Sequence, residues 1–192
     1  MQQLLCKGLF VRQVLWLAIG VFFISLCISS NAFGQTELEK IHQKIIVDHE
    51  QVEHVSAEEF IEMETAGADI IIFDVRKKSE FAVSHLQNAI RLDPGTKADE
   101  FEQLYGEQLQ GKTVVFYCSV GRRSSAMAEE VAQVIENSEA AAFNLTGGVF
   151  TWRNEERSLV SQASQSTTKV HPYNFYWGRL IEDKKAISYS PD

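Results

Sequence analysis

Two runs of mainly apolar residues constrain the fold of this chain more than any other feature. Residues 69–75 read Asp-Ile-Ile-Ile-Phe-Asp-Val, and residues 113–117 read Thr-Val-Val-Phe-Tyr. Such runs are typical of strands that are covered on both faces, as in parallel sheets. Shorter strands are expected near residues 52–55, 89–92 and 141–145, and helical spacing occurs at residues 57–67, 101–109 and 124–135 and around Trp152. Strands that alternate with helices predict an α/β domain with a mainly parallel sheet and helices on both faces.

Size and composition limit the class of protein further. The 192 residues correspond to about one domain, and 45% of them are hydrophobic while 23% are charged. This balance excludes a disordered chain and fits a domain with an ordinary core. The net charge of −8 argues against a nucleic-acid partner, because proteins that bind DNA or RNA neutralise phosphates with lysine and arginine.

The first 34 residues have the features of an export signal. They contain no acidic residue, two bases (Lys7 and Arg12) and an apolar run of 15 residues at 14–28, which is shorter than the ~20 residues that span a bilayer. Small residues follow at Ala32 and Gly34, with the spacing that a signal peptidase requires. We expect a cleaved signal peptide and an exported protein, periplasmic or extracellular. The alternative is an uncleaved N-terminal helix that anchors the protein in the membrane.

Cleavage after Gly34 would leave Cys118 as the single cysteine, because Cys6 and Cys27 would be removed with the signal. A thiol without a disulfide partner in its own chain is a liability in an oxidising compartment unless its chemistry is used. We therefore expect this thiol to be used in chemistry. A thiol-redox protein is disfavoured, since no second cysteine remains to resolve an oxidised intermediate.

Cys118 follows the second apolar run directly and precedes a helix that begins near Ser124. Ligands of open α/β sheets bind at the carboxyl ends of strands, where backbone amides and a helix N-terminus favour an anion. Gly121 lets the loop curve, and Arg122 and Arg123 add permanent positive charge. We predict that these groups lower the pKa of the Cys118 thiol. The alternative interpretation is an inert buried cysteine after a core strand.

Three motifs stand in the order found in one known family. They read Phe-Asp-Val-Arg at 73–76 with Glu-Phe at 80–81 and His85, Tyr-Cys-Ser-Val-Gly-Arg-Arg-Ser at 117–124, and Leu-Thr-Gly-Gly at 145–148 with Trp152. In these motifs residues 52–157 resemble a single rhodanese-like domain. The resemblance implies a sulfurtransferase that moves sulfane sulfur from a small anionic donor such as thiosulfate to cyanide or a thiol, through a persulfide on Cys118.

The resemblance also implies roles for particular residues. Cys118 is catalytic, and the substrate is bound by the residues that follow it, which are Ser119, Val120, Gly121, Arg122, Arg123 and Ser124. Asp74 and Arg76 support the site through an ion pair with a loop arginine, or they form a pair that braces the sheet edge. His85 is expected to pack or to stabilise a turn. No metal or cofactor is inferred, because the other histidines lack ligand spacing with acids or cysteines.

The length of the loop separates sulfur transfer from phosphate chemistry. Cysteine phosphatases place an arginine six residues after the nucleophile, in a wider loop that holds a phosphate. In this chain Arg123 is five residues after Cys118 and Ser124 takes the sixth position, so the tighter loop favours a single sulfur atom. Two departures from the family pattern remain. Arg122 is an extra base that leaves the substrate preference open, and Ser84 with Gln-Asn at 87–88 replaces the usual Gly and Pro-Gly around the histidine.

Together these features divide the chain into a signal peptide or anchor at 1–34, a helical N-terminal extension at 35–51, the rhodanese-like domain at 52–157, and a linker with an aromatic C-terminal tail at 158–192. The tail contains His-Pro-Tyr-Asn-Phe-Tyr-Trp at 171–177. Such a concentration of aromatic residues is expected to dock on the domain itself or on a protein partner. The alternative function is therefore a sulfur-carrier or anion-binding module that acts with a protein partner and turns over slowly alone.

Overall fold

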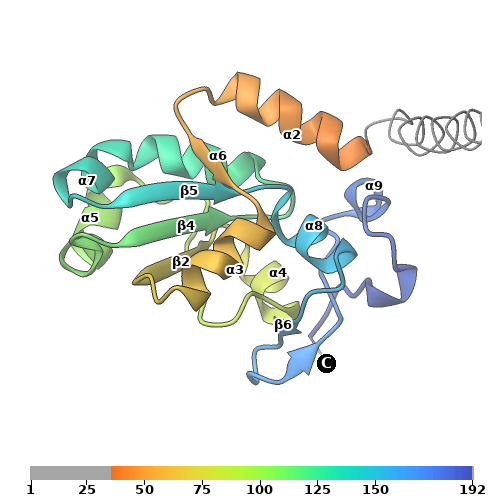
Figure 1. The fold of residues 1–192 in the computed structure, drawn as a ribbon. Helices are drawn as coiled ribbons and strands as arrows, with labels where there is room; N and C mark the ends of the chain where they lie inside the picture. Colours follow the sequence, from red (N-terminus) through yellow and green to blue (C-terminus); the bar gives the residue numbers. More distant parts are fainter. Residues whose placement is uncertain (1–35, 192) are drawn as a thin grey trace, which may run out of the picture. The chain divides into compact units, whose positions relative to one another are not determined.

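The two apolar runs form the centre of a five-stranded parallel sheet (Figure 1). The computed structural model describes residues 36–191, so the signal peptide or anchor expected at 1–34 lies outside the described part. The strand order is β1-β5-β4-β2-β3, where the strands are β1 Glu53–Val55, β2 Ile70–Asp74, β3 Ile90–Arg91, β4 Thr113–Tyr117 and β5 Ala141–Leu145. Every pairing in this sheet is parallel, which confirms the predicted class.

Side chains of the central strand β4 point alternately to the two faces of the sheet. Val115 and Tyr117 belong to a first apolar cluster, which includes residues of α3 (Ala57–Thr65) and α8 (Gly148–Asn154). Val114 and Phe116 belong to a second cluster, whose other members come largely from α5 (Ala98–Leu109), α6 (Arg122–Glu130) and α7 (Ala132–Asn137). Helices therefore cover both faces, as the alternation of strands and helices predicts.

The helix predicted over residues 124–135 is in fact two helices. α6 ends at Glu130 and α7 begins at Ala132, and Val131 between them has φ −103° and ψ 9°. Val131 is fully buried in the second cluster. The helix is interrupted while this side chain stays in the core, and the spacing of apolar residues alone does not reveal the interruption.

The helical extension expected at residues 35–51 contains α2 (Glu37–Asp48). Its first turn is closed by a capping box, in which the Thr36 hydroxyl accepts from the Glu39 amide at 3.2 Å and the Glu39 carboxylate accepts from the Thr36 amide. Leu38 and Ile41 pack against the first cluster, and Ile45 is buried. The apolar face of α2 therefore holds the extension on the domain.

The segment expected to be a linker folds instead as a hairpin. β6 (Leu159–Val160) and β7 (Ser166–Thr167) pair in antiparallel fashion, and Val160 also forms a bridge with His85. The Ser-, Gln- and Thr-rich composition of this stretch therefore marks a turn and a short exposed strand rather than a flexible connection.

The C-terminal tail docks on its own domain, which is one of the two expected places. It contains α9 (Phe175–Gly178) and a 3-10 helix at Lys184–Ala186. Val170, Ile181 and Ala186 are buried in the first cluster, whereas Phe175 and Tyr176 stay exposed. Within the described part of the chain, no helix combines the length and apolar character needed to cross a membrane.

Candidate active site around Cys118

Cys118 directly follows β4, the middle strand of the sheet, at the edge where the parallel strands end. A cavity of about 170 Å³ lies beside it, lined by Cys118, Ser119, Val120, Arg122, Arg123, Tyr173 and Trp177. Cys118 is only 1% exposed. A small molecule would therefore approach its sulfur through this cavity.

Helix α8 fixes the backbone of the loop that follows Cys118. The Cys118 carbonyl accepts a hydrogen bond from the Val149 amide at 2.9 Å, and the Ser119 carbonyl accepts from the Phe150 amide at 3.1 Å. A Cβ at Gly148 would lie 2.3 Å from the Cys118 oxygen, so only glycine permits this close approach. These two hydrogen bonds hold the first residues of the loop against the start of α8.

Gly121 turns the chain from the loop into α6. Its φ of +100° is a conformation that glycine adopts without strain, and a Cβ there would lie 3.0 Å from Nδ2 of Asn144. The Gly121 amide donates to Sγ of Cys118 at 3.3 Å, and its carbonyl accepts from the hydroxyls of Ser124 and Ser125. The predicted curvature at Gly121 is confirmed, and it directs an amide at the sulfur.

The pKa of the Cys118 thiol is shifted by two opposing influences. Burial is the largest, and it raises the pKa because a thiolate loses its water. The positive charge of Arg123 and hydrogen bonds from the backbone amides of Ser124 and Val120 lower it. The net shift is downward, in the predicted direction, so the site favours a thiolate.

A carboxylate absent from the predicted site residues holds Arg123 in place. Glu80, on α4 (Lys78–Val83), accepts from the Arg123 guanidinium at 2.9 and 2.8 Å. The Ser119 hydroxyl joins the pair, because it donates to Glu80 at 3.2 Å and accepts from Arg123 at 3.0 Å. Burial acts to raise the pKa of Glu80, but Arg123 and Arg76 outweigh it and the pKa is lowered. Glu80 belongs to the first family motif, which was the available signal for its role.

Asp74 and Arg76 do not pair with a loop arginine, so that expectation is wrong. The Arg76 guanidinium donates to both carboxylate oxygens of Asp74 at 2.7 and 2.6 Å, and to the Ser84 carbonyl at 2.6 Å. The Tyr117 hydroxyl donates to Asp74 at 2.7 Å and accepts from the Leu86 amide at 3.0 Å. Burial acts to lower the pKa of Arg76, and the Asp74 charge overrides it to raise the pKa. This sealed group ties β2, β4 and the turn after α4 together, which is the alternative role.

Two further residues that the sequence singles out, Arg122 and His85, have different surroundings. Arg122 is exposed, lines the cavity and forms no ion pair with any residue in 36–191. His85 is structural, because its ring stacks on Phe81 at 3.8 Å between centroids and its Nδ1 lies 3.1 Å from the Phe81 carbonyl. Within residues 36–191, no three or more His, Cys, Asp or Glu side chains are placed so that together they could hold a metal ion.

Two residues of the C-terminal tail complete the wall of the cavity. Tyr173 and Trp177 lie more than fifty positions from Cys118 in the sequence, yet they line the same space. The tail was expected to dock, but no local pattern in the sequence indicates where.

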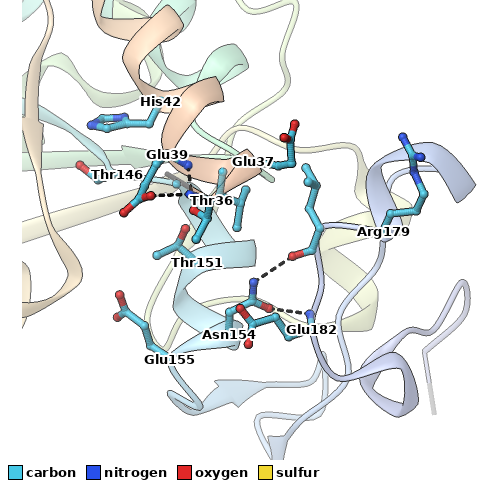
Figure 2. A pocket seen from close by; sticks show the side chains of 13 residues that line it. Thr36, Glu37, Glu39, His42, Thr146, Thr151, Asn154, Glu155, Arg179 and Glu182 are labelled. Carbon is cyan, nitrogen blue, oxygen red and sulfur yellow. Dashed lines mark hydrogen bonds between the residues drawn. The ribbon is translucent and has the colours of Figure 1, made fainter. Parts of the chain in front are cut away.

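A larger cavity of about 530 Å³ lies between α2, α8 and the segment after α9 (Figure 2). Four carboxylates line it, those of Glu37, Glu39, Glu155 and Glu182, and no cysteine does. Its clearest role is structural, because Asn154 binds the C-terminal segment there. Nδ2 of the Asn154 side chain donates to the Leu180 carbonyl at 2.8 Å, and Oδ1 of the same side chain accepts from the Glu182 backbone amide at 2.9 Å.

Comparison with known proteins identifies similar sequences and folds. The sequence model of the rhodanese-like domain matches residues 56–155. A thiosulfate sulfurtransferase from Pseudomonas aeruginosa is 15% identical with a TM-score of 0.52, and the match covers 73% of this chain and 25% of that protein. A rhodanese-related protein from Thermoplasma volcanium is 20% identical with a TM-score of 0.45, and the match covers 56% of this chain and 97% of that one. A rhodanese-like domain protein from Staphylococcus aureus is 20% identical with a TM-score of 0.41, over 53% and 91%.

Proposed function

We propose that this chain, which belongs to the rhodanese-like domain family, is a sulfurtransferase that carries sulfane sulfur as a persulfide on Cys118. One observation carries the proposal. A buried thiol whose pKa is lowered stands in a small cavity, where the Gly121 amide and the Arg123 guanidinium act on its sulfur. These groups stabilise a negative charge on sulfur, both on the thiolate and on a persulfide.

The first half-reaction loads the sulfur. The Cys118 thiolate attacks the outer sulfur of thiosulfate, the sulfur–sulfur bond of the donor breaks, and sulfite leaves with the bonding electron pair. The product is a persulfide that carries one negative charge on its terminal sulfur. Arg122 and Arg123 line the cavity and provide the positive charge that attracts a divalent anion.

The second half-reaction unloads the sulfur. The carbon lone pair of cyanide attacks the terminal sulfur of the persulfide, thiocyanate leaves, and the electron pair of the broken bond returns to Cys118 as thiolate. A thiolate acceptor would react in the same way and form a new persulfide. Because a covalent intermediate separates the two substrates, ping-pong kinetics are expected.

Intact mass spectrometry and steady-state assays test this function. The purified protein should gain the mass of one sulfur atom with thiosulfate and lose it when cyanide is added. The Cys118→Ser variant should fold with an unchanged circular dichroism spectrum and transfer no sulfur. Turnover by this variant, or a wild-type protein that never gains sulfur, would overturn the proposal.

A second candidate is a sulfur carrier that delivers to a protein partner. The observation that favours it is the group of exposed aromatic side chains in the tail, which are Tyr173, Phe175, Tyr176 and Tyr189, because such side chains are enriched at interfaces. Loading with thiosulfate without multiple turnovers on cyanide would favour the carrier over the enzyme.

We also propose that the protein is exported, on the basis of the basic and apolar pattern of residues 1–34. N-terminal sequencing of the protein recovered from producing cells tests this. A mature chain that begins after Gly34 supports export with cleavage. A chain that keeps residue 1 and is recovered in the membrane fraction supports the anchor.

A further inference from the structure

The outer wall of the cavity comes from a part of the chain that the family match does not include. The match ends at residue 155, whereas Tyr173 and Trp177 line the cavity beside Cys118. The nucleophile and its loop therefore belong to the shared domain, and part of the access route belongs to the C-terminal tail.

The tail is held firmly enough to act as a wall. The Val170 amide donates to the Ala186 carbonyl at 2.8 Å, and the Ser188 amide donates to the Val170 carbonyl at 3.1 Å. Asn154 of α8 binds the tail through the two hydrogen bonds drawn in Figure 2. A Cβ at Gly178 would lie 2.9 Å from the Pro172 side chain, so α9 packs closely on the strand-like segment before it.

Tyr173 is placed by its backbone and by two cations. Its φ is +65°, in the left-handed region that favours glycine, and its amide donates to Nδ1 of His171 at 3.0 Å. The Arg123 guanidinium lies 5.1 Å from the ring centroid, and Nζ of Lys77 lies 5.7 Å from it. Both distances are within the range of cation–π attraction. The ring therefore stands over the same arginine that faces the Cys118 thiolate.

We infer that Tyr173 is a specificity-determining residue, which restricts the site to small inorganic sulfur anions and excludes donors with an aromatic or peptide substituent. The inference rests on the proposed function. The cavity volume of about 170 Å³ is well below the ~300–1,000 Å³ of sites that bind drug-sized ligands. Cys118 is only 1% exposed, and it shares the lining of this cavity with Tyr173. We therefore expect a bulky group on the donor to meet the Tyr173 ring before its sulfur reaches the thiolate.

Two donors with the same chemistry and different size test the inference. Thiosulfate loads Cys118 and releases sulfite. Benzenethiosulfonate loads it in the same way, because the thiolate attacks the terminal sulfur and benzenesulfinate leaves with the electron pair of the broken bond. The quantity to compare is the ratio of kcat/KM for the two donors, with cyanide as the common acceptor.

Tyr173→Gly removes the ring and suits the positive φ, so the backbone should keep its path. Tyr173→Asn also tolerates this conformation and provides a second variant if the first folds poorly. Tyr173→Phe keeps the ring. Phe175→Ala is the matched control, since Phe175 is exposed on the same tail and does not line the cavity.

We expect the Gly and Asn variants to raise kcat/KM for benzenethiosulfonate relative to thiosulfate by at least about tenfold, as when a steric group is removed from a binding pocket. Tyr173→Phe and Phe175→Ala should keep the wild-type ratio. If the wild-type protein loads sulfur and every variant keeps the wild-type ratio of kcat/KM for the two donors, this inference is overturned and the proposed function stands. A wild-type protein that loads sulfur from neither donor would overturn both.

Discussion

Two carboxylate–guanidinium pairs stand near the carboxyl edge of the sheet, and they differ in what surrounds them. Asp74 and Arg76 are both fully buried, and their hydrogen-bond partners, the Ser84 carbonyl and the Tyr117 hydroxyl, are part of the scaffold. Glu80 is buried as well, but the side chain of its partner Arg123 is 26% exposed and lines the cavity beside Cys118. The same kind of ion pair thus braces a turn in one case and presents a positive charge to a nucleophile in the other.

The difference teaches that ion-pair chemistry alone does not identify a functional residue. A fully buried pair cannot contact a substrate. Its contribution shows as the loss of stability when one partner is removed. A pair with one open side can act on a third group, because the second charge fixes the geometry of the first. Substitutions of Arg76, Arg123 and Arg122 can break or sharpen this distinction.

The largest effect is expected on stability, from Arg76→Met. Removing one partner of a buried pair typically costs about 3–5 kcal/mol, and here it leaves the Asp74 carboxylate unpaired in the core. Urea unfolding followed by circular dichroism measures the loss. Lys112→Met is the control, because Lys112 pairs with the exposed Asp69 and such pairs contribute only about 0–1 kcal/mol.

The activity of folded Arg76→Met should stay within about threefold of wild type, since the Asp74–Arg76 pair does not line the cavity. A large loss of activity in protein that is still folded would contradict the structural assignment of this pair. Equal stability losses in Arg76→Met and Lys112→Met would do the same.

The next effect is expected on activity, from Arg123→Met. Loss of a charge that stabilises a reacting anion typically lowers kcat by about 10²–10³-fold, and kcat/KM for thiosulfate should fall by an amount of that order. Arg123→Lys is the matched control, since it keeps the charge but cannot donate two parallel hydrogen bonds to Glu80. It should retain an intermediate activity. A loss of only a few-fold in Arg123→Met would remove the distinction between the two pairs.

The pH dependence of Cys118 gives a third comparison. Only the thiolate reacts with iodoacetamide, so a lowered pKa keeps the alkylation rate high at pH values where an ordinary cysteine is protonated. In Arg123→Met the midpoint of the rate profile should move to higher pH, because the cation that favours the thiolate is gone. Arg76 is not among the main groups that shift this pKa, so Arg76→Met should leave the midpoint close to the wild-type value. A midpoint that moves in neither variant would show that Arg123 does not act on the thiol.

Much of the fold could be predicted from the sequence because the signals are local. The runs at β2 and β4 consist of neighbouring residues, and the capping box at the start of α3 joins Ser56 and Glu59, which are only three positions apart. The loop from Cys118 to Ser124 is equally local. Its glycine, its arginines and its place after a strand are adjacent in the sequence, so the lowered pKa of the thiol could be predicted too.

The parts that could not be predicted depend on contacts between distant residues. The sequence allows Asp74 to pair with Arg76 or with a loop arginine. Only the packed structure shows that Arg76 forms the pair, while Arg123 pairs with Glu80. The Tyr173 ring lies beside the Arg123 guanidinium, although the two residues are fifty positions apart in the sequence. No periodic pattern in the sequence predicts this contact. Val131 interrupts a helix whose apolar spacing continues, because its conformation follows from packing.

The smallest effect is expected from Arg122→Ala, which separates the two arginines of the loop. Arg122 is exposed and forms no ion pair with the described residues, so its charge acts on an anionic substrate through solvent. Such an effect is screened over about 8–10 Å at physiological salt. We expect kcat/KM for thiosulfate to fall by about two- to fivefold at low ionic strength and to approach the wild-type value at high salt. The deficit of Arg123→Met should persist at high salt, because Arg123 contacts its partners directly. A salt-independent loss in Arg122→Ala would instead mean that Arg122 touches the substrate, and the site would then depend on two cations rather than one.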